Sequence, residues 1–317
     1  MNTIAMANIL ILNNETFEFL LLHGLKPSPE MTKLMARQNE LEKLKMCHKF
    51  GIKISGKCYK HASMRGNFEL LNWLYENNIY YERHDRVFSC APTKDKLEVV
   101  KILDKYGLLY EHIDLISKHF VSIELFEGLE YLESIGYPIS SNLIKFAAME
   151  GNLNFLIWAN SQKIMIPSDA FGYAAEKRQF LVMRWMQKNY SSCNSHLAWK
   201  IASKKGLLDV MQFLYNHGYA TQTYISMYSI LYNCGRGGHC ECLTWLESVY
   251  DIKIMGIPEL VGAAESGQFK VLKWYKEKQG YLKQHEIDLI ISNTNKRWRM
   301  RIIKWLSDEG VTLSNKL

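Results

Sequence analysis

A large apolar residue returns every 27 to 32 positions along nearly the whole chain of 317 residues, and no other feature limits the possible folds as strongly. Other residue types repeat at fixed distances from it. Two small residues lie eleven and ten positions before it, a glycine seven before, a leucine-like residue two before, and a second glycine five after. Five columns in one register do not arise by chance. A period of this length indicates an array of repeated supersecondary units.

Two segments show one unit each: residues 61–74, "HASMRGNFELLNWL", and residues 147–158, "AAMEGNLNFLIW". We call the position of the tryptophan in these segments the reference position. Its occupants along the chain are Phe19, Met46, Trp73, Ile102, Tyr131, Trp158, Trp185, Phe213, Trp245, Trp274 and Trp305.

Each unit has the pattern of a helix–turn–helix hairpin. Apolar residues around the reference position follow the helical period, which predicts an amphipathic second helix of about ten residues. The glycine five positions later ends this helix, since glycine adopts a left-handed cap without steric cost. The small pair lies in a shorter first helix and lets a neighbour approach closely. The pattern predicts buried core anchors in the second helices at Trp73, Trp158, Trp185, Trp245 and Trp274.

One hairpin of about 28 residues cannot bury its own apolar face, so neighbouring hairpins must stack. The sequence therefore predicts an all-α solenoid of about 10 to 11 repeats, with residues 1–317 as a single domain. Residues 56–285 form the core repeats in this interpretation. Residues 1–55 form irregular N-terminal capping units, and residues 286–317 form a C-terminal capping unit.

Two units depart from the pattern. Phe120 and Val121 occupy the positions where other units have the small pair. Near the end of the chain, Thr294 and Asn295 replace the small pair and Trp298 replaces the glycine. Irregular terminal units are expected in an array, because the end repeats need a different outer face.

Four segments resemble ankyrin repeats: "YKHASMRGNFELLNWL" (59–74), "IKFAAMEGNLNFLIW" (144–158), "WKIASKKGLLDVMQFL" (199–214) and "LVGAAESGQFKVLKWY" (260–275). Each has an apolar residue, two small residues, two variable residues, and then a glycine before the second helix. The Thr-Pro-Leu-His opening of ankyrin repeats is absent, and the period is about five residues shorter than their 33. The resemblance therefore implies an ankyrin-like array with β-hairpin fingers that are reduced or absent.

The Trp-Leu pairs and the composition rich in Asn, Lys and Ile are similar to the divergent ankyrin arrays of giant DNA viruses that infect amoebae. Tetratricopeptide repeats, of 34 residues, and HEAT repeats, of about 40, fit the period less well.

The ankyrin resemblance implies that the two variable residues before the glycine line a concave binding surface. The partner-binding residues that it implies are Arg65, Met149, Glu150, Glu176, Lys177, Lys204, Lys205, Arg236 and Glu265. Four of these are cations in three consecutive units, and helices pack about 8–10 Å apart. We therefore expect a basic stripe roughly 20–25 Å long, bounded by Glu150 and Glu265, that faces an acidic ridge on a protein partner.

The segment 234–242, "CGRGGHCEC", contains residue types that bind zinc. The register places Cys234, Cys240 and Cys242 in core columns, where free cysteine is a small buried hydrophobe. We expect buried thiols without metal or disulfide rather than a site that also uses His239. No catalytic motif stands out, so we expect no enzyme, no cofactor and no metal.

The net charge of +7 is concentrated at one end, because residues 252–317 hold 12 Lys or Arg and 7 Asp or Glu. The segment 296–305, "KRWRMRIIKW", carries Lys296, Arg297, Arg299 and Arg301. One interpretation is that this segment binds a nucleic acid or an acidic partner. The other is that it forms the solvated face of the last helices. The absence of a recognised nucleic-acid module favours the second interpretation.

These patterns favour a non-enzymatic scaffold that binds a protein partner on its concave face. Nucleic-acid binding through the basic C-terminal third is the alternative, and a substrate adaptor for ubiquitin ligation ranks lower, because neither end carries a docking motif such as an F-box. The first residues lack the pattern of a signal peptide or membrane span. Seven cysteines at irregular spacing suit a reducing compartment, so we expect the cytoplasm, which is the host's if the protein is viral.

Overall fold

The computed structural model describes residues 11–80, 84–190, 193–219, 224–250 and 256–311. These residues form 21 α-helices and two short 3₁₀ helices, with no strand among them, and about 73% of the described residues are helical. The predicted all-α class is confirmed. Residues 1–10, on which the expectation about a leader segment depends, and residues 312–317, the end of the predicted C-terminal capping unit, lie outside the described residues.

The chain divides into two compact units, Met1–Pro138 and Ile139–Leu317, which we describe in turn. One array domain over residues 1–317 stays a prediction. The first unit contains α2 (Asn14–Leu22), α3 (Pro29–Arg37), α4 (Leu41–Lys49), α5 (Cys58–Met64), α6 (Phe68–Glu76), α7 (His84–Cys90), η1 (Thr93–Asp95), α8 (Lys96–Lys105), η2 (Tyr110–His112), α9 (Ile113–Ser122) and α10 (Phe126–Ser134).

The second unit consists of six helix pairs. They are α11 (Ser141–Glu150) with α12 (Leu153–Ser161), α13 (Ala170–Glu176) with α14 (Phe180–Asn189), α15 (Ser195–Lys205) with α16 (Leu208–Asn216), α17 (Tyr224–Gly237) with α18 (Cys240–Tyr250), α19 (Pro258–Ser266) with α20 (Phe269–Gln279), and α21 (Gln284–Asn293) with α22 (Lys296–Asp308). In each of the first five pairs, the first helix carries the small residues and the second carries the reference residue.

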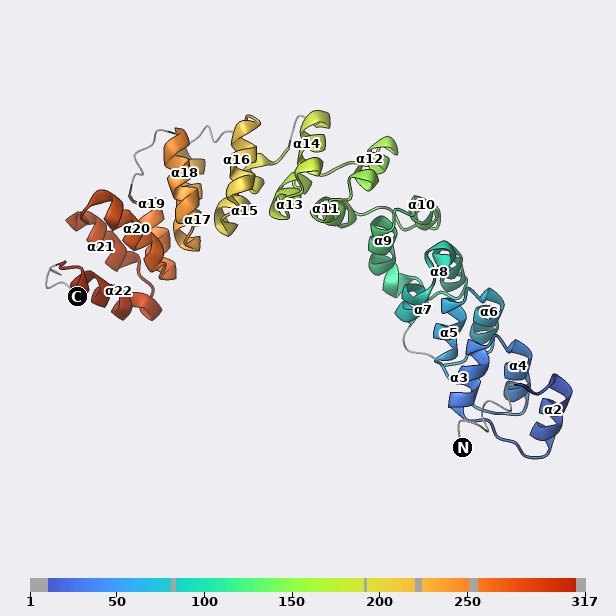
Figure 1. The fold of residues 1–317 in the computed structure, drawn as a ribbon. Helices are drawn as coiled ribbons and strands as arrows, with labels where there is room; N and C mark the ends of the chain where they lie inside the picture. The colour runs from blue at the N-terminus through green and yellow to red at the C-terminus, as the bar shows by residue number, and fades with distance from the viewer. Residues whose placement is uncertain (1–10, 81–83, 191–192, 220–223, 251–255, 312–317) are drawn as a thin grey trace. The chain divides into compact units, whose positions relative to one another are not determined.

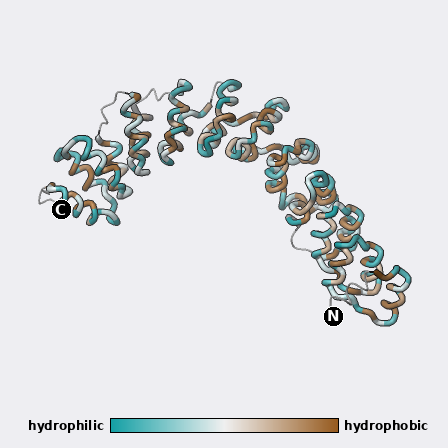
Figure 2. Tube along the Cα trace, viewed as in Figure 1, coloured by the Kyte–Doolittle hydropathy of each residue, from teal (hydrophilic) through white to brown (hydrophobic). Residues whose placement is uncertain are grey.

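Helices in the second unit form two layers. The first helices α11, α13, α15, α17 and α19 each contact the next one along the chain, and each packs on its own second helix. Figure 1 shows these first helices along one side of the unit and α12, α14, α16 and α18 along the other. Apolar and polar residues alternate along the helices of both layers (Figure 2). The apolar core therefore lies between the layers and between successive pairs.

The small pair is what allows the first helices to approach so closely. Its alanine, serine and cysteine side chains, such as Ala147, Ala148 and Cys234, have no exposed surface. The closest approach is between α17 and α19: a methyl group on Gly235 would come within 2.1 Å of the Glu259 carbonyl oxygen. Any larger side chain at these positions would push two backbones apart.

Eight units share one backbone conformation in the turn between the two helices, whereas Asp95, at the same position in the unit of Ile102, has a φ of −101°. The residue seven positions before the reference has a positive φ at Asn39, Gly66, Glu124, Gly151, Arg178, Gly206, Gly238 and Gly267. The next residue donates its N–H to the carbonyl of the first small residue, as from Leu207 to Ala202 at 2.9 Å, which is the Schellman arrangement of a helix end. Arg178, which stands where most units have glycine, adopts the same left-handed conformation, with a φ of 58°.

The predicted burial of the reference tryptophans is wrong. All five are only half-buried, although each lies in the second helix of its unit as expected. The residues with no exposed surface are those three and two positions before and one after, for example Leu70, Leu71 and Leu74 around Trp73. With 3.6 residues per turn, the reference position points roughly 100° away from the centre of that stripe. The tryptophan therefore covers the edge of the core, and at Phe19 the side chain is 57% exposed.

The unit with Phe120 in place of a small residue is compensated on its other helix. Phe120 and Val121 are fully buried in α9. Gly128, in α10, lies directly beneath the Phe120 ring, and a methyl group there would come within 2.6 Å of Phe120 Cε2. Other units have a large residue at this position, such as Leu70. The small residue has moved to the partner helix, so the hairpin keeps its spacing.

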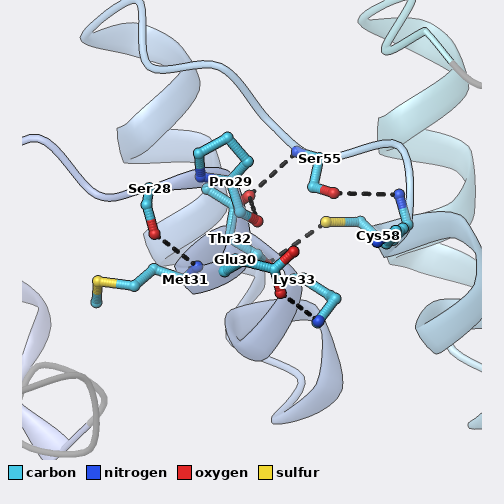
Figure 3. A network of polar contacts seen from close by, with 9 residues as sticks. Ser28, Pro29, Glu30, Met31, Thr32, Lys33, Ser55 and Cys58 are labelled. Carbon is cyan, nitrogen blue, oxygen red and sulfur yellow. Dashed lines mark hydrogen bonds and ion pairs between the residues drawn. The ribbon is translucent and has the colours of Figure 1, made fainter. Parts of the chain in front are cut away.

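Polar contacts join successive hairpins near the start of the first unit (Figure 3). The fully buried Thr32 donates its hydroxyl to the Pro29 carbonyl at 2.9 Å and accepts the Ser55 N–H at 3.1 Å. The thiol of Cys58, at the start of α5, donates to the Thr32 carbonyl at 3.4 Å. These bonds fix the loop before α5 to α3.

The exchange between Phe120 and Gly128 predicts a non-additive pair of mutations. Gly128→Ala should lower the free energy of unfolding by about 1–3 kcal/mol, because it overpacks a closed site. Phe120→Ala should lower it by about 3–5 kcal/mol. In the double variant the new methyl group fits the vacated space, so urea denaturation should show less destabilisation than the sum of the two. Ser134→Ala, at an exposed position of α10, is the control and should change little; additive effects would contradict the described packing.

The left-handed backbone of Lys163 predicts that glycine at this position would stabilise the protein. This exposed lysine follows α12 at φ 60°, a conformation that disfavours a side chain. Lys163→Gly should raise the free energy of unfolding by about 0.5–1 kcal/mol after the entropy of glycine is allowed for. Lys200→Gly, at an exposed position inside α15, is the matched control and should lower it by about 1 kcal/mol. Destabilisation by both changes in thermal melts would contradict the assigned conformation of Lys163.

Candidate partner-binding ridge

The residues that the sequence assigns to partner binding lie at the C-terminal ends of the first helices. In the second unit, α11 ends at Glu150, α13 at Glu176, α15 at Lys205, α17 at Gly237 and α19 at Ser266. Because successive first helices contact one another, these ends lie side by side. We call the row the ridge; it consists of Met149, Glu150, Glu176, Lys177, Lys204, Lys205, Arg236 and Glu265.

The ridge residues stand on a buried frame. Each pair of variable positions follows two fully buried small residues and precedes the left-handed turn, so the side chains cannot fold back into the core. Glu150, Lys177, Lys204, Lys205 and Arg236 are exposed, whereas Met149, Glu176 and Glu265 are half-buried. Core packing therefore does not constrain which residue types occupy these positions.

Arg65 is the predicted residue that the structure does not bring to the ridge. It is exposed at the C-terminal end of α5, in the unit Met1–Pro138. It has the corresponding place in its own hairpin, next to Gly66.

Two of the four predicted stripe cations form ion pairs across neighbouring hairpins. Lys205 Nζ lies 2.6 Å from Glu176 Oε1, and the Arg236 guanidinium lies 4.0 Å from Glu265 Oε2. Tyr232 donates its hydroxyl to the same Glu265 carboxylate at 2.5 Å, which raises the pKa of Tyr232. The structure thus places an acid beside two of the four cations of the predicted basic stripe, and the stripe as a binding surface stays a prediction.

Lys177 and Lys204 form no ion pair with any acidic residue in the described ranges. A contact to the next hairpin holds the backbone at Lys204, and a contact to the preceding hairpin holds the chain just after Lys177. His239 Nε2 lies 3.1 Å from the Lys204 carbonyl, and Gln179 donates to the Met149 carbonyl at 3.1 Å. The central part of the ridge therefore carries two exposed amines on a fixed backbone, and sequence reasoning alone did not separate them from the paired cations.

The cysteines of the segment 234–242, beside the ridge, are buried as predicted. Cys234, Cys240 and Cys242 are at most 8% exposed, and His239 points to the preceding hairpin rather than toward them. Burial raises the pKa of the Cys240 thiol. Within the described ranges, no three His, Cys, Asp or Glu side chains are grouped closely enough to hold a metal ion.

An open pocket of about 420 Å³ lies in the first unit, between the loops that follow α2 and α4. Its walls are apolar, from Leu21, Leu25, Phe50 and Ile52, and two lysines complete the lining. It offers apolar contacts and amines, but its lining contains no acid, thiol or imidazole. This chemistry does not provide an acid–base pair or a nucleophile with a base.

A buried carboxylic acid lies at the start of α19. Glu259 has no exposed surface; its Oε1 accepts the Gly256 N–H at 3.0 Å, and its Oε2 has no hydrogen-bond partner among the described residues. Glu286, nearby and 4% exposed, accepts the Tyr275 hydroxyl at 2.7 Å. Burial, with a smaller contribution from the charge of Glu286, raises the pKa of Glu259 to about 7. The side chain is therefore a neutral acid below about pH 7.

Among the described helices, none is both long and apolar enough to cross a lipid bilayer. No protein-family model matches the chain, and no curated protein matches its sequence.

The raised pKa of Glu259 predicts a pH-dependent stability. The pKa of this group is higher in the folded than in the unfolded protein, so its contribution to stability is complete below about pH 4.5 and is lost as the pH rises through about 7. Relative to Glu259→Gln, the wild type should lose on the order of 3 kcal/mol of unfolding free energy between these two values. Urea denaturation at each pH measures this difference.

Glu277→Gln, at an exposed position of α20, is the control and should follow the wild type at every pH. A curve for Glu259→Gln that runs parallel to the wild type from pH 4.5 to 8 would show that Glu259 does not titrate in this range.

Proposed function

We propose that the chain is an ankyrin-like solenoid that acts as a non-enzymatic scaffold and binds a protein partner along the ridge. One observation carries the proposal: consecutive first helices pack side by side, so that their exposed C-terminal residues form a row on a frame of buried small residues. We propose further that it acts in the cytoplasm, in keeping with the cysteine usage, and that this is the host's cytoplasm if the resemblance to viral arrays is one of descent.

The dimensions of the ridge suit a protein partner. Five helices at about 8–10 Å spacing give a row roughly 30–40 Å long. A stable protein interface needs about 800 Å² on each side, or about 20–30 residues, so the ridge with its adjoining loops has the necessary extent. A small-molecule ligand would instead need a concave, enclosed site.

The charges of the ridge define the partner's chemistry. Lys177 and Lys204 attract an acidic group at the centre, whereas Glu150, Glu176 and Glu265 lie around them. These carboxylates would repel a continuous phosphate backbone but accept a protein surface with acids and bases in alternation. Because exposed ion pairs contribute only about 0–1 kcal/mol, a partner can replace the contacts of Lys205 and Arg236 at small cost.

Charge reversal at the centre of the ridge tests the proposal. Lys177→Glu with Lys204→Glu should leave the helix content and the melting temperature unchanged, since both side chains are exposed and unpaired within the described residues. Association with a protein partner captured from cell lysate should slow by roughly tenfold or more at low salt, because such charges mainly set the encounter rate. The loss should shrink above about 0.5 M salt, where the Debye length falls to a few ångström.

Lys188→Glu with Lys270→Glu is the matched control, because these exposed lysines lie on the second helices α14 and α20. Biolayer interferometry on both double variants gives the association rates. Equal rates for the wild type and the ridge variant in low salt, or equal slowing by the control, would show that the ridge does not carry the interaction.

A further inference from the structure

Helix α22 carries the densest group of cations in the described part of the chain. Its first nine residues contain five, and no acid occurs in the helix before Asp308. The group, which we call the α22 cations, consists of Lys296, Arg297, Arg299, Arg301 and Lys304, and all five are exposed. The inner side of the helix is formed by the buried Ile302, Trp305 and Leu306.

The α22 cations are spread across the outer face of the helix. With 3.6 residues per turn, they occupy an arc of about 200° opposite the buried residues. Met300 lies near the centre of this arc and is 76% exposed. Arg299 and Arg301, on either side of it, point roughly 160° apart. The helix therefore presents positive charge on both flanks and at the centre.

This arrangement is unfavourable for the isolated helix. The first turn contains three cations and no acid, although the N-terminal end of a helix dipole is already positive. Arg297 and Arg301 are four residues apart, a spacing at which like charges repel. None of the α22 cations forms an ion pair with a described acidic residue, whereas Lys276 and Lys278 of the neighbouring α20 are paired with Glu309 and Glu247.

Trp298 holds two of the arginines in place. The guanidinium groups of Arg297 and Arg301 lie over its ring, at 4.9 and 5.8 Å from the centroid. The ring itself packs on Gly267 in the turn of the preceding hairpin, where a methyl group would come within 2.4 Å of Trp298 Cδ2. Cation–π contacts of this kind lower the freedom of the two side chains before any ligand binds.

From these observations we propose that α22 binds double-stranded DNA through its phosphate backbones. Arginine pairs with phosphate in a bidentate manner, and three of the five cations are arginines. A helix about 10–12 Å wide with cations on opposite flanks matches a major groove about 12 Å wide, with one phosphate strand on each side. The deep, narrow major groove of double-stranded RNA does not admit such a helix.

The apolar Met300 at the centre of the arc offers no hydrogen bond to base edges, so the binding is largely independent of sequence. The α22 cations are distinct from the ridge residues, and this second activity does not depend on the proposed protein partner.

Fluorescence anisotropy with the full chain and a labelled DNA duplex of about 25 base pairs tests the proposal. The logarithm of the binding constant should fall with the logarithm of the salt concentration with a slope of about −4.5, as expected for five phosphate contacts. Arg297→Gln with Arg299→Gln and Arg301→Gln should lower the affinity by roughly tenfold or more and reduce the slope to about −2. The corresponding triple change to lysine keeps the charge and should retain most of the affinity.

Lys177→Gln with Lys188→Gln and Lys204→Gln removes the same charge elsewhere and should bind DNA like the wild type. Loss of affinity in this control would assign DNA binding to the ridge or to net charge and overturn the proposal. So would the absence of binding to DNA at low salt, or tighter binding to double-stranded RNA, polyglutamate or phosphatidylserine vesicles. The wild-type measurements decide between these outcomes even where a variant fails to fold.

Discussion

The whole structure depends on how closely one first helix can approach the next. At the small-pair positions of the second unit, the neighbouring helix leaves room only for alanine, serine, cysteine or glycine, and at Gly235 in α17 and Gly262 in α19 it requires glycine. Because each hairpin is too small to bury its apolar face alone, this contact supplies the core that a single unit lacks. The left-handed turn follows from the same constraint, since it ends the first helix directly after the contact and turns the chain back toward the second layer.

The sequence predicts this frame well because the frame is local and repeated. Helix pairs, turn positions and small columns all follow from residue type at a fixed spacing. The tryptophans were misplaced for a geometric reason: a large apolar residue in every unit suggested the centre of the core, whereas its helical angle places it at the edge. The helical angle of the tryptophan can be calculated from the sequence alone. The glycine at position 128, in the unit that has Phe120, can also be read from the sequence.

Other features could not be predicted from one sequence. A left-handed conformation at Arg178 or Lys163 is adopted because the surrounding chain imposes it, against the preference of the side chain. The pairing of Lys205 with Glu176 depends on the lateral distance between two helices, 29 residues apart in sequence, which residue types do not specify. The sequence therefore indicates that the candidate residues lie at the helix ends, but it does not indicate which of their charges are paired.

Ion pairs between hairpins separate two kinds of cation in this protein. Lys205, Arg236 and Lys276 lie between neighbouring hairpins, and each forms an ion pair with an acid of the adjacent hairpin, so these charges are used within the protein. Lys177, Lys204 and the α22 cations have no such partner among the described residues, and in α22 they oppose the helix dipole as well. An arrangement that lowers the stability of its own helix is most easily explained by a ligand that supplies the missing negative charge. The ridge, with two such cations among carboxylates, suits a mixed protein surface, whereas α22, with five and no acid nearby in the helix, suits phosphate.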